Sequence, residues 1–282
     1  MPGTLFVVAT PIGNLEDLTF RALRTLREVD LIAAEDTRRT SKLLAHYAVQ
    51  KPLVSLREHN EARVSADLAG RMASGVNVAL VSDAGTPGIA DPGARLVATA
   101  REQGIRVVPI PGPSAIAAAV SVSGFPTDTF TFLGFPPARG QAREDWFADI
   151  AAEQSMVIFF EAPHRIRSTL EGLSKTLGLR PIIVVREATK LHEWMAISPK
   201  AADIVERGEF VVVVAPAVGP AVSSAEPRVV TEIIDRMTKD GSFKEDEAIV
   251  AASALTNSKP ATIRKILKKS RILAKRATTS PA

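Results

Sequence analysis

The chain has 282 residues, of which 46% are hydrophobic and 23% charged, as is typical of a soluble globular protein. The length suits one large or two ordinary domains, and no apolar run approaches the roughly 20 residues that a membrane span needs. The absence of cysteine excludes disulfides, thiolate zinc sites and cysteine nucleophiles. Because the N-terminal stretch also lacks the basic start of a signal peptide, we expect a cytoplasmic protein.

The net charge of +4 is unevenly distributed along the chain. From Lys259 onward there are eight basic residues and no acidic one, so the preceding residues carry a net charge of −4. A basic block of this kind indicates a polyanionic partner such as nucleic acid, or simply a solvated tail.

Short runs rich in valine and isoleucine alternate with segments of helical period. Leu18, Ala22, Leu26 and Val29 fit one such helical stripe. This alternation predicts an α/β fold with a largely parallel sheet covered by helices on both faces. The predicted strands, in chain order, are 4–9, 31–34, 76–81, 105–110, 130–135, 156–160, 182–186 and 210–215.

The predicted domains are residues 1–113, residues 114–217 and a basic helical region over 226–282. A linker rich in Gly, Pro, Ser and Ala over 218–227 precedes the helical region. The last region shows three helical patterns, the third beginning after Pro260, a good first-turn residue. The pattern is compatible with a helix-turn-helix and equally with a plain helical cap on the larger domain.

Six unusual loops follow predicted strands, and ligands of open α/β sheets lie beyond the carboxyl ends of strands. No P-loop, no GxGxxG after a strand and no GxSxG is present, which argues against nucleotide hydrolases and serine hydrolases. The four histidines lack ligand spacing, so no metal site is expected. The six loops, expected along one edge, are 9–19, 34–40, 56–61, 82–93, 111–115 and 160–165.

The residue types in these loops favour a small polar ligand. Gly85 lets backbone approach a ligand closely, and Asp83 offers a carboxylate to an ammonium or hydroxyl group. Ser114 and free backbone N–H groups lie at the start of a predicted helix, where negative charge is favoured. From the residues alone, the prediction is an α/β ligand-binding site.

Six motifs in this order resemble the ribosomal RNA small-subunit methyltransferase I family of the tetrapyrrole-methylase superfamily. The resemblance implies two α/β domains with S-adenosylmethionine in the cleft between them, and a homodimer. It also implies methylation of a cytidine ribose 2′-hydroxyl in the decoding centre of 16S rRNA, within the small ribosomal subunit. The motifs are TPIGNL (10–15), AAEDTR (33–38), EHNE (58–61), VSDAGTPGIADPG (81–93), PGPSA (111–115) and EAPHR (161–165).

The resemblance also implies site residues. A base near the 2′-hydroxyl would be Asp36, His59 or Glu61, with Arg38 or Arg165 holding phosphate. Asp36 and the 59–61 segment could instead be helix-start signals. The implied cofactor-binding residues are Ile12, Gly13, Asp83, Gly85, Ser114, Ala115, Glu161 and Ala162; Lys265, Lys268 and Lys269 would contact RNA.

Two other classes of protein remain open at this point. One is a small-molecule methylase of the same superfamily, acting on a tetrapyrrole. The other is a non-catalytic RNA-binding factor that uses the α/β region as a scaffold.

Overall fold

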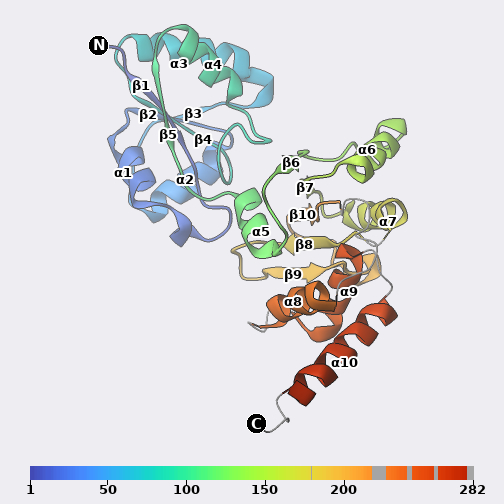
Figure 1. Cartoon of the computed structure of the whole chain (residues 1–282). Coiled ribbons are helices and arrows are strands. Elements are labelled where there is room, and N and C mark those ends of the chain that lie inside the picture. The colour runs from blue at the N-terminus through green and yellow to red at the C-terminus, as the bar shows by residue number, and fades with distance from the viewer. Residues whose placement is uncertain (179, 218–226, 240–242, 257–259, 278–282) are drawn as a thin grey trace. The chain divides into compact units, whose positions relative to one another are not determined.

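The computed structural model describes residues 1–178, 180–217, 227–239, 243–256 and 260–277 (Figure 1). The chain forms two compact units: Met1–Ala118 with Glu187–Glu193, and Ala119–Arg186 with Trp194–Ala282. The domain limits predicted from the sequence stay a prediction, and the predicted linker lies outside the described residues except for Pro227.

The first unit is built on a five-stranded sheet in which every strand pairing is parallel. The strand order is β3-β2-β4-β1-β5, so β4 is the central strand, with β2 and β1 on either side of it. Parallel strands covered on both faces read as continuous apolar runs, as β2 and β4 do. The strands are β1 (Thr4–Val8), β2 (Leu31–Ala34), β3 (Leu53–Ser55), β4 (Val78–Val81) and β5 (Arg106–Ile110).

Helices cover both faces of this sheet (Figure 1), as predicted. Successive side chains of a strand point to opposite faces: Leu31 packs in the cluster that contains α3 and α4, whereas Ile32 packs in the cluster that contains α1 and α2. The helices are α1 (Phe20–Glu28), α2 (Thr37–His46), α3 (Glu61–Ala73) and α4 (Ala94–Glu102); α5 (Ala115–Ser123) follows β5.

The second sheet has the order β6-β7-β10-β8-β9, and only β6 and β7 are parallel. The expectation of a largely parallel sheet is therefore wrong for this unit. The segment Glu187–Glu193 that connects β8 to β9 is shorter than the crossover of about a dozen residues that neighbouring parallel strands need. The strands are β6 (Phe130–Phe132), β7 (Met156–Glu161), β8 (Ile182–Arg186), β9 (Trp194–Ile197) and β10 (Phe210–Val214), with the short 3-10 helix η3 (Ala201–Asp203) before β10.

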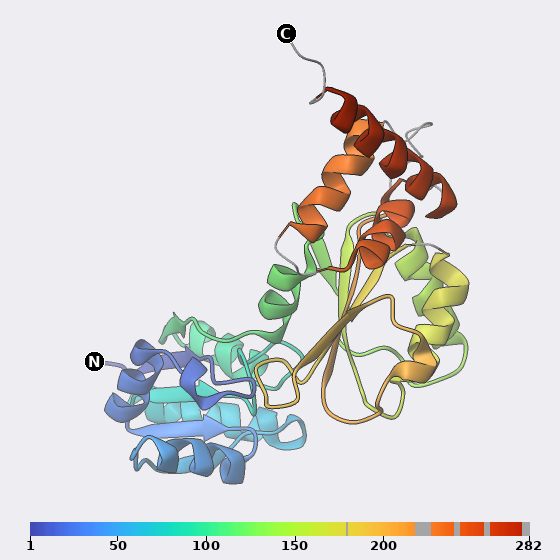
Figure 2. The same cartoon turned by 90° about the horizontal axis from the view of Figure 1, so that it is seen from below.

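Two helices, α6 (Gln141–Ala152) and α7 (Ile166–Leu177), lie side by side on one face of the second sheet (Figure 2). Their apolar side chains share a core with alternate residues of β7, β8 and β10. Trp146 and Phe159 meet edge to face there, with ring centroids 4.9 Å apart. This core fixes the loop that follows β7.

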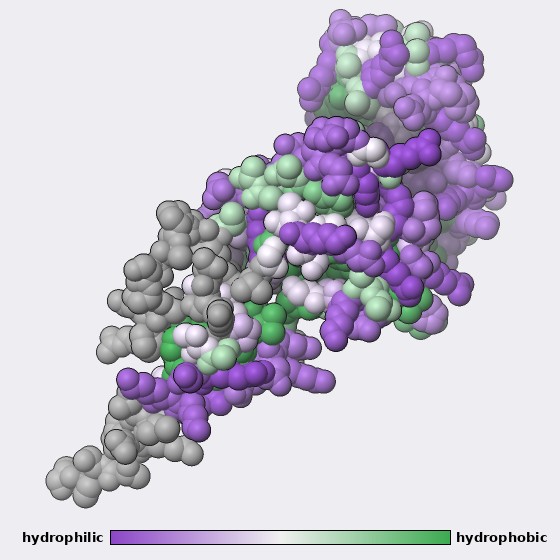
Figure 3. Space-filling model, turned by 90° about the vertical axis from the view of Figure 1, so that its right-hand side faces the viewer, coloured by the Kyte–Doolittle hydropathy of each residue, from purple (hydrophilic) through white to green (hydrophobic). Residues whose placement is uncertain are grey.

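The predicted C-terminal helical region is confirmed as α8 (Pro227–Thr238), α9 (Glu245–Leu255) and α10 (Pro260–Ala277). The three helices enclose a core of their own, which includes Ile234, Ile249 and Leu267. Hydrophilic side chains dominate the face of the molecule in Figure 3, with only small apolar areas between them. Among the described helices, none has both the length and the apolarity needed to cross a membrane.

Candidate active site

The carboxyl ends of all five strands of the first sheet lie at one edge, because every pairing is parallel. Five of the six predicted loops therefore meet at this edge, as expected. The sixth, after β7, belongs to the second sheet, so the expectation that all six share one edge is wrong. The candidate site residues accordingly fall into two groups, one in each compact unit.

Three loops of the first unit are tied into one backbone-lined surface. Thr10 and Gly85 exchange two backbone hydrogen bonds of 2.9 and 3.0 Å, and the Thr86 hydroxyl donates to the Pro113 carbonyl over 3.3 Å. Gly85 has a φ of +78°, a backbone conformation that residues with a side chain rarely adopt. The structure thus brings together the loops that carry Ile12, Gly85, Ser114 and Ala115; we call residues 10–13, 82–86 and 111–115 the loop wall.

Ser114 begins α5 in the manner expected of a helix start. Its hydroxyl accepts a 3.4 Å hydrogen bond from the Ala117 N–H, and its carbonyl accepts one of 2.9 Å from the Ala118 N–H. Ala115 is the first residue of the helix. Backbone N–H groups at such a position favour a negatively charged ligand group.

Asp83, predicted to bind the cofactor, follows β4 and contacts the loop after β2. Its carboxylate accepts a 2.9 Å hydrogen bond from the Asp36 N–H and lies 3.4 Å from the Arg39 guanidinium. The Asp83 N–H in turn donates to the Glu35 carboxylate over 3.3 Å. The predicted cofactor residue and the predicted base Asp36 are therefore direct neighbours.

Asp36 is the N-cap of α2, which was the alternative reading of its motif. Its carboxylate accepts from the Arg38 N–H at 2.9 Å and from two guanidinium nitrogens of Arg38 at 3.1 and 2.8 Å. These hydrogen bonds with Arg38 hold the pKa of Asp36 well below its usual range. A carboxylate of low pKa accepts a proton weakly, so this geometry favours a positioning role. Arg38 itself is 82% exposed.

Of the other two candidate bases, His59 lies in the loop after β3 and Glu61 is the first residue of α3. One Glu61 oxygen accepts hydrogen bonds from the Gly93 N–H at 2.8 Å and the Arg95 N–H at 3.1 Å, which satisfies the start of α4. His59 is exposed on the short 3-10 helix η2 (Glu58–Asn60). Glu61 therefore has a structural role at the start of α4, whereas the His59 side chain is exposed at the surface.

Sequence reasoning missed two acidic residues at this edge, Glu35 and Asp91. Burial, followed by the charge of Glu35, raises the pKa of Asp91 to about 6, although a hydrogen bond with Ser82 opposes the shift. Burial also raises the pKa of Glu35. Glu35 lies in the AAEDTR motif and Asp91 in the SDAGTPGIADPG motif. The signal that could have found them is a carboxylate directly after a buried strand or within a turn crowded with glycine and proline.

The residues of the second unit form a buried ionic network at the end of β7. The side chain of Glu161 is fully buried, and its carboxylate lies 2.8 Å from the Arg165 guanidinium and 4.0 Å from that of Arg143. It also accepts from the Ala162 N–H at 2.7 Å and from the Thr169 hydroxyl. This arrangement fixes the EAPHR loop, and with it the backbone of Ala162.

The two arginines of the network also hold the loop after β6. Arg165 donates to the Pro136 carbonyl over 3.1 Å and Arg143 to the Pro137 carbonyl over 2.8 Å. The Arg165 side chain is only 19% exposed. Its guanidinium, predicted to hold RNA phosphate, therefore has partners within the protein.

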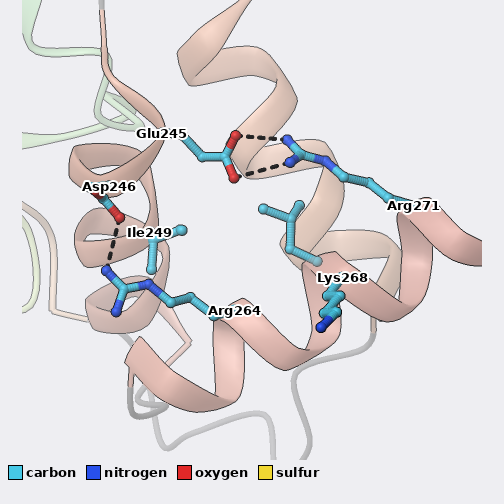
Figure 4. Close-up of a pocket in the computed structure, with 7 residues that line it drawn as sticks. Glu245, Asp246, Ile249, Arg264, Lys268 and Arg271 are labelled. Atoms are coloured by element: carbon cyan, nitrogen blue, oxygen red, sulfur yellow. Dashed lines mark hydrogen bonds and ion pairs between the residues drawn. The ribbon is translucent and has the colours of Figure 1, made fainter.

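The predicted RNA-contacting lysines lie exposed on α10. The neighbouring arginines are paired with α9 instead: Arg264 lies 2.8 Å from Asp246, and Arg271 lies 3.0 Å from Glu245 (Figure 4). These pairs line a surface depression of about 300 Å³. Lys268 extends from α10 away from Glu245 (Figure 4). Among the α10 side chains that the structure describes, Lys265, Lys268 and Lys269 are exposed lysines, and we call these three the lysine face.

Within the described residues, no group of three or more His, Asp or Glu side chains could hold a metal ion. The features of the first unit are instead those of a site for an organic ligand: a backbone-lined wall, a helix start and clustered carboxylates.

Comparison with known proteins agrees with this class of site. Residues 4–199 match the family model of tetrapyrrole (corrin/porphyrin) methylases. The fold is also that of diphthine synthase, at a TM-score of 0.60 and 18% identity over 76% of this chain and 90% of that one. The methyltransferase CobJ gives a TM-score of 0.58 at 20% identity, over 77% of this chain and 95% of that one. The family model thus identifies the chain as a methylase, and its fold is that of this class.

Curated relatives show which family of methylases the chain resembles. The ribosomal RNA small subunit methyltransferase I of Xylella fastidiosa is 49% identical over 222 residues, which cover 76% of this chain and 81% of the relative. The protein of the same name from Pasteurella multocida is 40% identical over 264 residues, 89% of this chain and 92% of the relative. The chain belongs to the ribosomal RNA small subunit methyltransferase I family, within the tetrapyrrole methylases.

Proposed function

We propose that this protein transfers a methyl group from S-adenosylmethionine to the ribose 2′-hydroxyl of a cytidine in the decoding centre of 16S rRNA. The family is one of methyltransferases, and its members are named for the RNA of the small ribosomal subunit. The observation that carries the proposal is the loop wall, which is joined by hydrogen bonds and lies at the carboxyl edge of a parallel sheet.

The residues of the first unit suit this cofactor chemically. Ile12 supplies an apolar side chain to the wall, and the backbone N–H groups at the start of α5 suit a carboxylate group of the cofactor. The carboxylates of Asp83 and Asp91 suit hydroxyl groups and positive charge. When bound, S-adenosylmethionine supplies an electrophilic methyl group on a positively charged sulfur. In the second unit, we propose that the backbone of Ala162, held by Glu161, also contributes to cofactor binding.

The reaction needs little more from the chain than alignment and one proton acceptor. Fixing the hydroxyl in line with the methyl group removes an entropic cost, and a base contributes roughly 10²- to 10⁴-fold. We propose His59, Asp36 or Glu61 as that base. The hydrogen bonds of the two carboxylates favour His59, which is exposed on the loop after β3. The expected role of Asp36 is to hold Arg38 toward an RNA phosphate.

We propose that the lysine face of α10 binds RNA phosphate, because its charges are exposed while Arg264 and Arg271 are engaged with α9. For Arg165, a phosphate contact is proposed only for the small exposed part of its side chain. The protein is proposed to act as a homodimer in the cytoplasm, where the small subunit is assembled.

Labelled S-adenosylmethionine tests the proposal when offered with 30S subunits, free 16S rRNA and a tetrapyrrole precursor. We expect label in the RNA. Label on the macrocycle would support a small-molecule methylase, and failure to bind S-adenosylmethionine would support a non-catalytic RNA-binding factor; either result would refute the proposal.

A further inference from the structure

The segment Glu187–Glu193 connects β8 to β9 of the second unit but packs within the first unit. Its Thr189 hydroxyl accepts a 3.1 Å hydrogen bond from the Asn14 N–H, across 175 positions of the sequence. Asn14 directly follows the part of the loop wall that carries Ile12 and Gly13. A distant segment of the chain therefore contacts the loop after β1 through a specific polar bond.

Packing against Gly13 supports the same contact. A Cβ atom on Gly13 would lie 2.3 Å from Cγ of Lys190, 2.9 Å from Oγ1 of Thr189 and 3.1 Å from the Ala188 carbonyl oxygen. The first two separations are shorter than real Cβ atoms tolerate, so the side chains of Lys190 and Thr189 can lie against the backbone at position 13 only because that residue has no side chain. Gly13 thus serves this contact, whatever it also offers to a ligand.

The segment is held in a defined shape of its own. The Lys190 N–H donates to the Glu187 carbonyl and the Glu193 N–H to the Lys190 carbonyl, both over 3.0 Å. The Lys190 ammonium lies 2.8 Å from the Glu187 carboxylate, and the Glu193 carboxylate accepts from the Thr189 N–H. These bonds restrict the conformations of the segment and so hold the Thr189 hydroxyl in position to accept from Asn14.

Two residues of the segment have an unfavourable backbone conformation. Glu187 and Thr189 have φ values of +53° and +66°. The left-handed region is uncommon for residues other than glycine and a genuine outlier for a β-branched one. Conformations of this kind persist where the surrounding contacts enforce them, and they cluster at ligand clamps and active sites.

We propose that residues 187–193 form a clasp that positions the loop after β1 for cofactor binding, with Thr189 as the positioning residue. The clasp fixes Asn14 and closes over Gly13, and so sets the place of Ile12 beside Gly85, whose Cβ position lies 3.5 Å from Cγ2 of Ile12. This inference rests on the proposed function, in which the loop wall holds S-adenosylmethionine.

The test compares Thr189→Val, which keeps the β-branched shape but removes the acceptor, with Thr189→Ser, which keeps the acceptor. Calorimetric titration with S-adenosylhomocysteine should give a Kd that rises about two- to tenfold for Thr189→Val, the range for one lost neutral hydrogen bond. Thr189→Ser should restore the wild-type value. Thr176→Val, which removes an exposed hydroxyl on α7, is the matched control and should leave the Kd unchanged.

If Thr189 had only a structural role, Thr189→Val would lower stability without a specific effect on cofactor binding. Steady-state kinetics distinguish the two roles. The KM for S-adenosylmethionine should rise in Thr189→Val, while kcat at saturating cofactor and the KM for RNA stay within about twofold. Equal Kd and KM values in wild type and Thr189→Val would overturn the clasp.

Hydrogen exchange separates failure of the clasp from failure of the proposed function. In the protein without ligand, the Asn14 amide should exchange faster in Thr189→Val than in wild type. If wild type binds no S-adenosylhomocysteine, the proposed function fails, and unchanged Asn14 exchange would then overturn the clasp as well. Gly13→Ala offers a second variant, expected to speed exchange at Asn14 by displacing Lys190.

Discussion

The Arg165 guanidinium lies 2.8 Å from the carboxylate of Glu161, whose side chain is fully buried. Buried ion pairs add little net stability, but removing one partner leaves an uncompensated charge. Arg165→Ala should therefore destabilise the second unit by about 3–5 kcal/mol, measured by urea unfolding.

The replacement of both partners is the control for this pair. The double variant Glu161→Gln, Arg165→Met should recover much of the loss, because no buried charge is left without a partner. If Arg165→Ala weakened RNA binding and left unfolding unchanged, Arg165 would be an RNA contact and the structural account of this residue would be wrong.

Conservative amide substitutions distinguish two of the candidate bases, His59 and Glu61. His59→Gln should lower kcat by roughly 10²- to 10⁴-fold, the contribution of a general base. Glu61→Gln should have a smaller effect, because an amide oxygen can still accept from the Gly93 and Arg95 N–H groups. Single-turnover methyl transfer at saturating cofactor measures these effects directly.

Glu61→Ala tests the structural role of Glu61, since it leaves the start of α4 without its acceptor. A loss of about 0.5–2 kcal/mol in unfolding free energy is expected, as for other lost helix caps. An unchanged kcat in His59→Gln combined with a large loss in Glu61→Gln would assign the base to Glu61.

The raised pKa of Asp91 predicts how stability changes with pH. The folded state binds the proton more tightly than the unfolded chain, so stability from protonation is present at low pH and is lost as pH rises from about 4 to about 6. Asp91→Asn should remove this dependence and raise the unfolding free energy at pH 7 by roughly 1–2 kcal/mol, less than the full pKa shift corresponds to, because the carboxyl is only partly buried. Urea unfolding at pH 5 and pH 7 measures both effects.

If Asp91 contacts the cofactor, Asp91→Asn should also weaken cofactor binding. The substitution would then raise stability at the expense of function, as is common at active sites. Asp67→Asn is a suitable control, since Asp67 is half exposed and pairs with Arg71 on the surface of α3. It should change unfolding by no more than about 0.5 kcal/mol. Equal effects of the two substitutions at pH 7 would contradict the account of Asp91.

The lysine face makes a prediction about salt. Replacing its three lysines with glutamine should weaken RNA binding and lower the slope of log K against log salt by roughly 2 to 3, since each neutralised phosphate contributes about 0.7–0.9. Filter binding at several salt concentrations gives the slope. Lys175→Gln, an exposed lysine on α7, should leave it unchanged, and an unchanged slope in the triple variant would refute the RNA contact.

Much of the fold was predictable, because each element depends on local pattern. The eight long apolar runs all form strands, and the stripe from Leu18 to Val29 contains α1. The missed strands, β3 and β9, lie at the edges of their sheets and are only partly buried, so they lack the near-continuous apolar run that marks a strand covered on both faces. The direction of β10 was missed because strand direction depends on the connections between strands.

The site was predictable in its location and less so in its roles. The loops that carry Ile12, Gly85 and Ser114 do meet, since parallel strands dictate where their carboxyl ends lie. That Glu61 would satisfy the start of α4, or that Gly13 would face Lys190, could not be predicted, because these contacts join segments far apart in sequence. Motif spacing identifies the residues, and long-range packing decides what each one touches.

The most direct test of the central claim is the nucleoside composition of the reaction product. Small subunits lacking the modification are incubated with the protein and S-adenosylmethionine, and their 16S rRNA is digested and analysed by mass spectrometry. The account predicts a new 2′-O-methylcytidine, in a yield that falls in His59→Gln. Methyl groups on bases only, or none in the RNA despite cofactor binding, would contradict it.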